Sequence, residues 1–144
     1  MMENYMELII PSYSKNESFA RAVVGAFFSQ LDPDLNDLNE LKTAVSEAVT
    51  NAIIHGYPDG VGEIRIKAKI YDDVFEVNII DQGVGIENIE QAREPLYTSK
   101  PEMERSGLGF SVMEGFMDEV EIISKVGAGT QITLRKKINN LKAQ

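Results

Sequence analysis

Hydrophobic positions along the chain recur with two periods, one typical of strands and one typical of helices. Residues 63–70 alternate polar and apolar side chains, which predicts a half-buried strand. Shorter apolar runs predict four more strands, over residues 5–10, 74–80, 120–124 and 131–136. Apolar spacings of three and four predict helices over residues 16–30 and 110–117, and a short one near residues 86–93. A further helix is expected to start at Asp32-Pro33 and to run to about His55.

The order of these elements predicts the fold class. One strand, two helices, two strands, a long loop, one helix and a closing hairpin do not alternate as in a doubly wound parallel fold. They favour an α+β protein, a two-layer α/β sandwich with helices on one face of a mixed, mostly antiparallel sheet. We expect residues 1–144 to form a single domain. The weakly periodic residues 81–109 are longer than an ordinary connection, which predicts a functional lid or disorder.

Composition and charge exclude several classes of protein. The chain has no cysteine and one histidine, which excludes disulfides and thiolate metal sites and disfavours a zinc site built from histidines. The net charge of -9 would repel a phosphate backbone, so no direct contact with nucleic acid is expected. No apolar run approaches the roughly 20 residues that span a bilayer. The acidic N-terminus does not resemble a signal peptide. The expected location is therefore the cytoplasm, without membrane contact.

The end of the second predicted helix, SEAVTNAIIHG, carries polar residues on the border of an apolar stripe. Glu47 and Asn51 are four residues apart and therefore point the same way. A carboxylate can act as a general base, and an amide oxygen can bind Mg²⁺. Taken by itself, the spacing is better interpreted as a solvated helix edge. His55 comes directly before a glycine and is interpreted as a capping or packing group.

A second candidate motif, DQGVG, follows directly after an apolar strand. Asp81 at the strand end could accept a hydrogen bond from an amino group. Gly83 and Gly85 permit positive φ angles and the close approach of a ligand to the backbone. The alternative is an ordinary turn.

Two more glycine motifs occur later in the chain. Residues 104–110, ERSGLGF, place glycines directly before a predicted helix, where backbone N–H groups bind anions. Lys100 and Arg105 add positive charge there that suits phosphate, although the segment could be only a flexible loop. Residues 127–129 predict a hairpin turn, and the Thr130 hydroxyl just after it could face a ligand.

In order and spacing, the four motifs resemble the GHKL ATP-binding fold, which includes gyrase-type ATPases, the Hsp90 chaperone, MutL-type repair proteins and histidine-kinase catalytic domains. The stretches ESFAR, EAVTNAIIHGY and PLYTSKPEMERSGLGFSVMEGFMDEV are similar to the anti-sigma F factor family of spore-forming bacteria. Members of that family are stand-alone serine protein kinases that also sequester the sporulation sigma factor. The resemblance covers essentially the whole chain and implies a lid over about residues 86–109.

The resemblance implies a role for each matched position. Glu47 would be the general base, Asn51 the Mg²⁺ ligand, and Asp81 the group that recognises the adenine amino group of ATP or ADP. The other nucleotide-binding positions that it implies are Gly83, Gly85, Lys100, Arg105, Ser106, Gly107, Leu108, Gly109 and Thr130. The implied partners are a sporulation sigma factor, an anti-anti-sigma factor as substrate, and a second copy of the chain in a homodimer.

The first predicted helix carries the implied partner contact. Phe19, Val23 and Phe27 are expected on its buried face, with Glu17 and Arg21 opposite them as an exposed ion pair. In the resembled family the arginine of SFAR contacts both partner proteins, so the resemblance implies that role for Arg21.

Two alternative functions stay open. The chain could be a sigma-sequestering module that uses nucleotide only as a conformational ligand, or a switch of the general-stress branch of the same family. The intact Glu47-Asn51 pair favours catalysis, because a pure binding module needs no base. A histidine kinase is disfavoured, since 144 residues leave no room for a phospho-acceptor hairpin. The signatures of eukaryotic-type protein kinases are missing.

Overall fold

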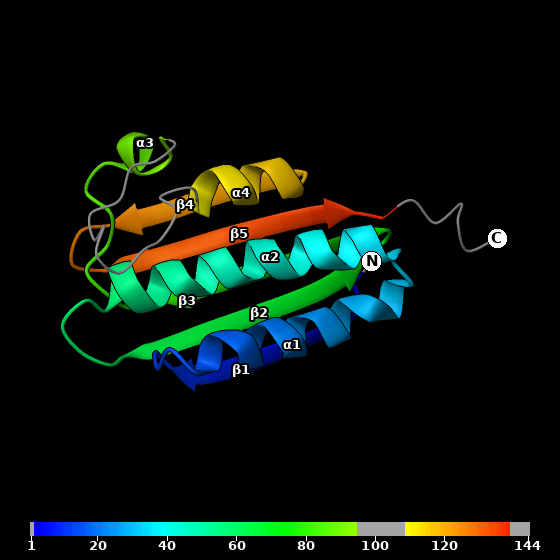
Figure 1. Ribbon diagram of the computed structural model, residues 1–144, viewed down its shortest axis with the longest axis horizontal. Helices are drawn as coiled ribbons and strands as arrows, with labels where there is room; N and C mark the ends of the chain where they lie inside the picture. Colours follow the sequence, from blue (N-terminus) through cyan, green and yellow to red (C-terminus); the bar gives the residue numbers. More distant parts are fainter. Residues whose placement is uncertain (1, 95–108, 139–144) are drawn as a thin grey trace.

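In the computed structural model, which describes residues 2–94 and 109–138, one antiparallel sheet is covered on one face by helices (Figure 1). Its strands are β1 (Met2–Pro11), β2 (Glu63–Tyr71), β3 (Val74–Asp81), β4 (Glu119–Lys125) and β5 (Gly129–Lys137). They lie in the order β1-β2-β3-β5-β4, and each neighbouring pair is antiparallel. The predicted α+β two-layer class is confirmed. No parallel pair occurs among the described strands, although a mixed sheet was expected.

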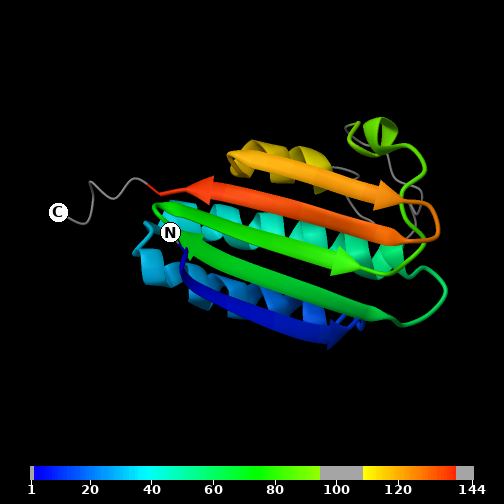
Figure 2. The ribbon, with the colours of Figure 1, turned by 180° about the vertical axis from the view of Figure 1, so that it is seen from behind.

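Helices α1 (Asn16–Phe28), α2 (Leu35–Asn51) and α4 (Gly109–Phe116) lie on a single side of this sheet, as the view from behind shows (Figure 2). A fourth, short helix, α3 (Ile89–Ala92), follows β3 in the chain. A 3-10 turn, η1 (Ser29–Leu31), follows α1, and a π-helical turn, η2 (Ala52–Gly56), continues α2. None of the helices in the described ranges is long and apolar enough to cross a membrane.

The core lies between the sheet and helices α1, α2 and α4. Alternate residues of β2 and β3 point into it, and α2 adds a stripe of apolar side chains. Phe28 of α1 packs edge-on against Phe75 of β3, with ring centroids 4.9 Å apart. Each large apolar side chain that is fully buried stabilises the fold by roughly 1.5–3 kcal/mol. The apolar core between the helices and the sheet therefore holds α2 in its position over β3 and β5.

The start of α2 differs from the prediction. Its N-cap is Asp34, whose Oδ1 accepts a hydrogen bond from the backbone N–H of Asp37 at 2.8 Å. Asp32 instead ends the preceding 3-10 turn in a left-handed conformation, with φ of 53°. A capping residue needs extended backbone, which Asp34 has and Asp32 lacks, so the predicted cap at Asp32 is wrong.

The buried face of α1 is also rotated relative to the prediction. The buried positions are Ala20, Val24, Gly25, Phe27 and Phe28, whereas Phe19 is half exposed. The small residues of this stripe let α1 approach α2, because a Cβ on Gly25 would lie 3.1 Å from the Lys42 side chain. Of the three residues expected on the buried face, Phe19, Val23 and Phe27, only Phe27 is buried.

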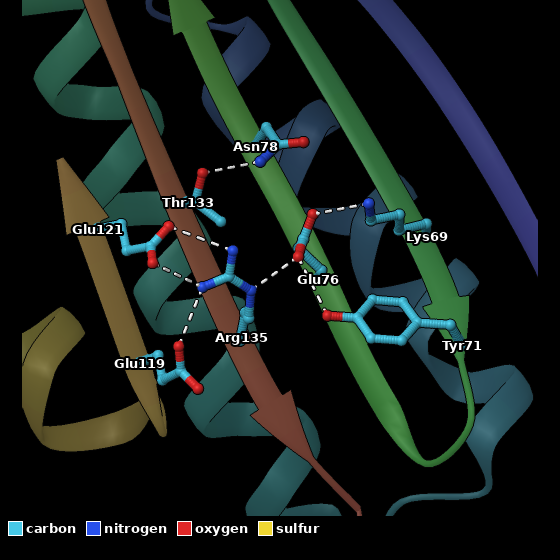
Figure 3. A network of polar contacts seen from close by, with 8 residues as sticks. All are labelled: Lys69, Tyr71, Glu76, Asn78, Glu119, Glu121, Thr133 and Arg135. Atoms are coloured by element: carbon cyan, nitrogen blue, oxygen red, sulfur yellow. Dashed lines mark hydrogen bonds and ion pairs between the residues drawn. The ribbon is translucent and has the colours of Figure 1, made fainter. Parts of the chain in front are cut away.

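On the other face of the sheet, a network of charged side chains surrounds Glu76 (Figure 3). The Glu76 side chain is only 8% exposed, and its Oε1 accepts hydrogen bonds from Arg135 Nε at 2.7 Å and from the Tyr71 hydroxyl at 3.1 Å. Lys69 Nζ lies 3.2 Å from Oε2. Burial alone would raise the pKa of Glu76, but these three donors outweigh it and hold the pKa below its ordinary value.

Candidate functional site

At one end of the sheet, the predicted site residues of β3 and β5 lie side by side. Asp81 pairs with Thr130, and Thr130 pairs in turn with Ser124 of β4, so all three lie on the helix-covered face. Asp81 and Thr130 are both buried, at 3% and 5% exposure. In Figure 1 the end of α2 lies at the left, over the part of the sheet formed by β3 and β5. The structure therefore brings together parts of three of the four predicted motifs.

The Asp81 carboxylate is held by backbone donors. Its Oδ1 accepts a hydrogen bond from Gly83 N–H at 2.9 Å, and the backbone N–H of Thr130 also donates to it. Burial raises the pKa of Asp81, and these two donors only partly oppose that effect. Gly56 leaves room for the carboxylate, because a Cβ there would lie 2.9 Å from Asp81 Cγ. A buried carboxylate next to the end of a helix is well suited to accept a hydrogen bond from a ligand amino group.

The two glycines after Asp81 are required by close packing of the backbone. A Cβ on Gly83 would lie 1.9 Å from the carbonyl oxygen of Gly56, which also accepts a hydrogen bond from Val84 N–H at 2.9 Å. Gly85 has φ of +79°, and a Cβ there would lie 2.3 Å from the Lys125 carbonyl oxygen. In the described structure, the chain's own backbone makes the close approach that the sequence suggested for a ligand.

Glu47 and Asn51 lie on successive turns of α2, and both are half-buried. The helix is regular up to Asn51, which preserves the four-residue spacing that aligns the two side chains. It then widens into the π-helical turn η2, which includes His55. A π-helical turn shifts the residues that follow it out of line, and such turns are frequent at functional sites. The exclusion of His55 from the catalytic pair stays a prediction.

Two residues at this end of the sheet were not among the predicted site residues. The Tyr57 hydroxyl donates to the Glu63 carbonyl and accepts from Gln82 N–H, both at 2.6 Å, and so joins the loop after α2 to β2 and β3. Burial raises the pKa of this phenol. Ser124 lies against Thr130, with 2.8 Å between the two hydroxyl oxygens. The sequence pattern could have shown that Ser124 faces inward, because it continues the alternation of the inward-facing residues Val120 and Ile122.

The remaining predicted residues divide into two groups. Lys100, Arg105, Ser106, Gly107 and Leu108 lie outside the described residues, whereas Gly109 begins α4. Arg21 lies on α1, where its Nε is 3.7 Å from a carboxylate oxygen of Glu17. In Figure 1 the first turns of α1 lie at the same end of the molecule as the last turns of α2.

Two further observations concern metal-binding groups and the surface beside the site. Within the described ranges, no group of three or more His, Asp or Glu side chains is placed to bind a metal ion. A surface groove of about 400 Å³ lies beside the site, between the loop from Gly56 to Val61 and residues 82–84. Among the described residues, Gly83 is the one predicted nucleotide-binding residue that lines this groove, whereas Asp81 and Thr130 do not line it.

Comparison with known proteins establishes the family. The model of the histidine kinase-like ATPase domain matches residues 11–136. The anti-sigma F factor of Halalkalibacterium halodurans is 55% identical over 99% of this chain and 98% of that protein. That of Clostridium beijerinckii is 55% identical over 96% of this chain and 98% of that protein. The chain belongs to the anti-sigma F factor family. The resemblance inferred from its motifs is therefore confirmed.

A solved structure shows that the fold is shared more widely than the sequence. The RsbU and RsbW domains of Rv1364c from Mycobacterium tuberculosis align with 94% of this chain at a TM-score of 0.67 and 20% identity. This chain covers 32% of that longer protein. At this identity the likeness concerns the fold alone, the sheet and the helical layer that covers it.

Proposed function

We propose that the protein is an anti-sigma factor and an ATP-dependent serine protein kinase. It would bind and inhibit a sporulation sigma factor and use Mg-ATP to phosphorylate a serine of the anti-anti-sigma factor. The observation that carries this proposal is the buried Asp81-Thr130 pair beside the end of α2, the helix that holds Glu47 and Asn51. Membership of the anti-sigma F factor family supports the choice of partners.

The described residues fit the adenine end of a nucleotide. Asp81 would accept the adenine amino group, and Thr130 would face the same edge of the base. Asn51 would bind Mg²⁺ through its amide oxygen, with the remaining ligands coming from phosphate and water, as Mg²⁺ in nucleotide sites prefers. Lys100, Arg105, Ser106, Gly107, Leu108 and Gly109 would contact the phosphates.

The proposed reaction requires little covalent chemistry from the protein's own side chains. Bound Mg-ATP would supply the phosphoryl group, and most of the catalysis would be positioning and charge stabilisation. Glu47 would accept the proton of the serine hydroxyl as that oxygen bonds to the γ-phosphorus and the bond to ADP breaks. Because Glu47 is on the turn of α2 before Asn51, the proton acceptor would lie next to the metal ligand.

Replacing Asp81 with Asn tests the nucleotide site. The variant keeps the size of the side chain but loses the charge that accepts the adenine amino group. We expect the Kd for ADP to rise about tenfold, the equivalent of a charge-assisted hydrogen bond worth roughly 1.5 kcal/mol. Isothermal titration calorimetry with ADP measures this. Asp59→Asn, in the exposed loop beside the site, is the matched control and should bind ADP normally. An unchanged affinity in Asp81→Asn would contradict the assignment.

A kinase assay separates the proposed enzyme from the alternative binding module. The purified chain is mixed with labelled ATP and a candidate anti-anti-sigma protein, and label on a serine of that protein is measured. Label on serine supports the kinase, whereas nucleotide-dependent sigma binding without transfer supports the module.

Binding to a sporulation sigma factor rather than a stress sigma factor distinguishes the two branches of the family. Light scattering tests the proposed homodimer.

Replacing Arg21 with Ala should weaken binding to both proposed partners about tenfold, the scale of one charged hydrogen bond. Its side chain is 41% exposed, and its only ion pair among the described residues is the loose one to Glu17. Such pairs add only about 0.2–0.5 kcal/mol to a helix, so the fold should be retained. Surface plasmon resonance with each partner measures the effect. Arg65→Ala, on the opposite face of the sheet, is the control, and equal losses in both variants would argue against Arg21.

A further inference from the structure

Ser124, to which no role has been assigned, lies in a cluster of polar groups next to Thr130. Ser124 Oγ is 2.8 Å from Thr130 Oγ1, 2.7 Å from the backbone nitrogen of Ile86 and 3.2 Å from the carbonyl oxygen of Gly129. The cluster is partly buried and joins β4, β5 and the segment that follows Gly85.

Counting hydrogens limits how this cluster can be arranged. A serine hydroxyl has one hydrogen to donate and two lone pairs. Ile86 N–H occupies one lone pair of Ser124, which fixes the oxygen within reach of Thr130. The Ser124 hydrogen can then go to Thr130 or to the Gly129 carbonyl. The 2.8 Å contact to Thr130 has an ordinary O–H···O length, whereas 3.2 Å to Gly129 is long for such a bond.

The direction of this hydrogen decides what Thr130 presents to a base. If Ser124 donates to Thr130, the Thr130 hydrogen is free to point into the site. Thr130 is then a donor directly opposite Asp81, an acceptor. Adenine offers the complementary pair on its Watson–Crick edge, an amino donor next to the N1 acceptor. If Thr130 instead donates to Ser124, the site presents two acceptors and loses that match.

We propose that Ser124 is a positioning residue for base recognition, which donates to Thr130 and so aims the Thr130 O–H at N1 of adenine. This inference rests on the proposed nucleotide-binding function and adds a residue that determines its specificity. Ser124 does not touch the base. It acts through Thr130, and its anchor is the backbone of Ile86 at the start of the segment after Gly85.

The test compares ADP with 1-deaza-ADP, in which a C–H replaces N1. Binding of each nucleotide is measured by calorimetry for the wild type, Ser124→Ala and Ser124→Thr. Loss of one oriented neutral hydrogen bond, worth about 1 kcal/mol, should weaken ADP binding to Ser124→Ala about fivefold. Binding of 1-deaza-ADP should be weak in the wild type and no weaker in Ser124→Ala. Ser124→Thr retains the hydroxyl and should keep the preference for ADP.

The outcomes separate this inference from the proposed function. If the wild type does not bind ADP, the proposed nucleotide site is wrong and the inference falls with it. If the wild type binds ADP but Ser124→Ala weakens both nucleotides equally, Ser124 only supports the fold and the inference alone is overturned. An unchanged ADP affinity in Ser124→Ala overturns it as well. Should Ser124→Ala not fold, Ser124→Cys keeps the volume with a weaker donor and should also lose part of the preference.

Discussion

Replacing Glu47 with Gln should abolish phosphoryl transfer and leave nucleotide binding intact. Glutamine has the same size and can stay on the same turn of α2, one turn before Asn51, but it cannot accept a proton. Removing a positioned general base typically lowers the rate roughly 10²–10⁴-fold. The rate of phosphate transfer to the anti-anti-sigma protein and the Kd for ADP, measured on the same preparation, report the two effects separately.

Glu40 provides the matched control for this experiment. It lies on α2 seven residues before Glu47, on the same border of the apolar stripe, and its carboxylate is 3.5 Å from Lys136 Nζ. Glu40→Gln therefore makes the same chemical change on the same helix outside the proposed site, and its kinase rate should be close to that of the wild type. Retained transfer in Glu47→Gln would show that Glu47 is not the base. Loss of ADP binding in that variant would assign Glu47 to binding instead.

The local part of this site could be predicted from the sequence. The alignment of Glu47 with Asn51 follows from helical geometry alone, and the structure keeps the helix regular through Asn51. The position of Asp81 at the end of an apolar strand was equally local, since β3 ends at Asp81. Both features depend on residues within a few positions of one another, so periodicity was sufficient.

The contacts between distant segments could not be predicted in this way. The pairing of Asp81 with Thr130 depends on the fact that β3 and β5 are neighbours and on their register. The hydrophobic pattern of a single strand shows which of its residues face the core but not which residue of another strand lies opposite each of them. The two hydrogen bonds of the Tyr57 hydroxyl, to the Glu63 carbonyl and from Gln82 N–H, could not be predicted from nearby residue types, because both partners are backbone groups. The prediction that Thr130 lies near the adenine came from the resemblance to a known family and not from the register.

A second large effect is expected away from the site, at Glu76 on the open face of the sheet. Glu76 points to the opposite face from Asp81 of the same strand, and its carboxylate accepts from Arg135 and Tyr71 while pairing with Lys69 (Figure 3). In Glu76→Gln an amide must replace one carboxylate oxygen, which places a donor against a donor. We expect the free energy of unfolding at neutral pH to fall by about 2 kcal/mol, a roughly 30-fold change in the unfolding equilibrium. The Kd for ADP should not change.

The pH dependence of this loss identifies its cause. The pKa of Glu76 is lower in the folded protein than in the unfolded chain, because the hydrogen bonds from its partners outweigh the effect of burial. The folded state is therefore stabilised above the unfolded-state pKa of 4.5, and that stabilisation is lost as the pH falls through the lower folded-state pKa. The glutamine side chain in Glu76→Gln does not titrate. In urea unfolding, the difference in free energy between the wild type and this variant should therefore begin to shrink below about pH 4.5, and it should shrink further as the pH falls through the folded-state pKa of Glu76. Glu119→Gln removes a partner of Arg135 that is 61% exposed, and it should cost under about 1 kcal/mol. If both variants lost the same stability, or if the loss at Glu76 did not shrink in acid, the hydrogen bonds and ion pair of the ionised Glu76 carboxylate would not be its source.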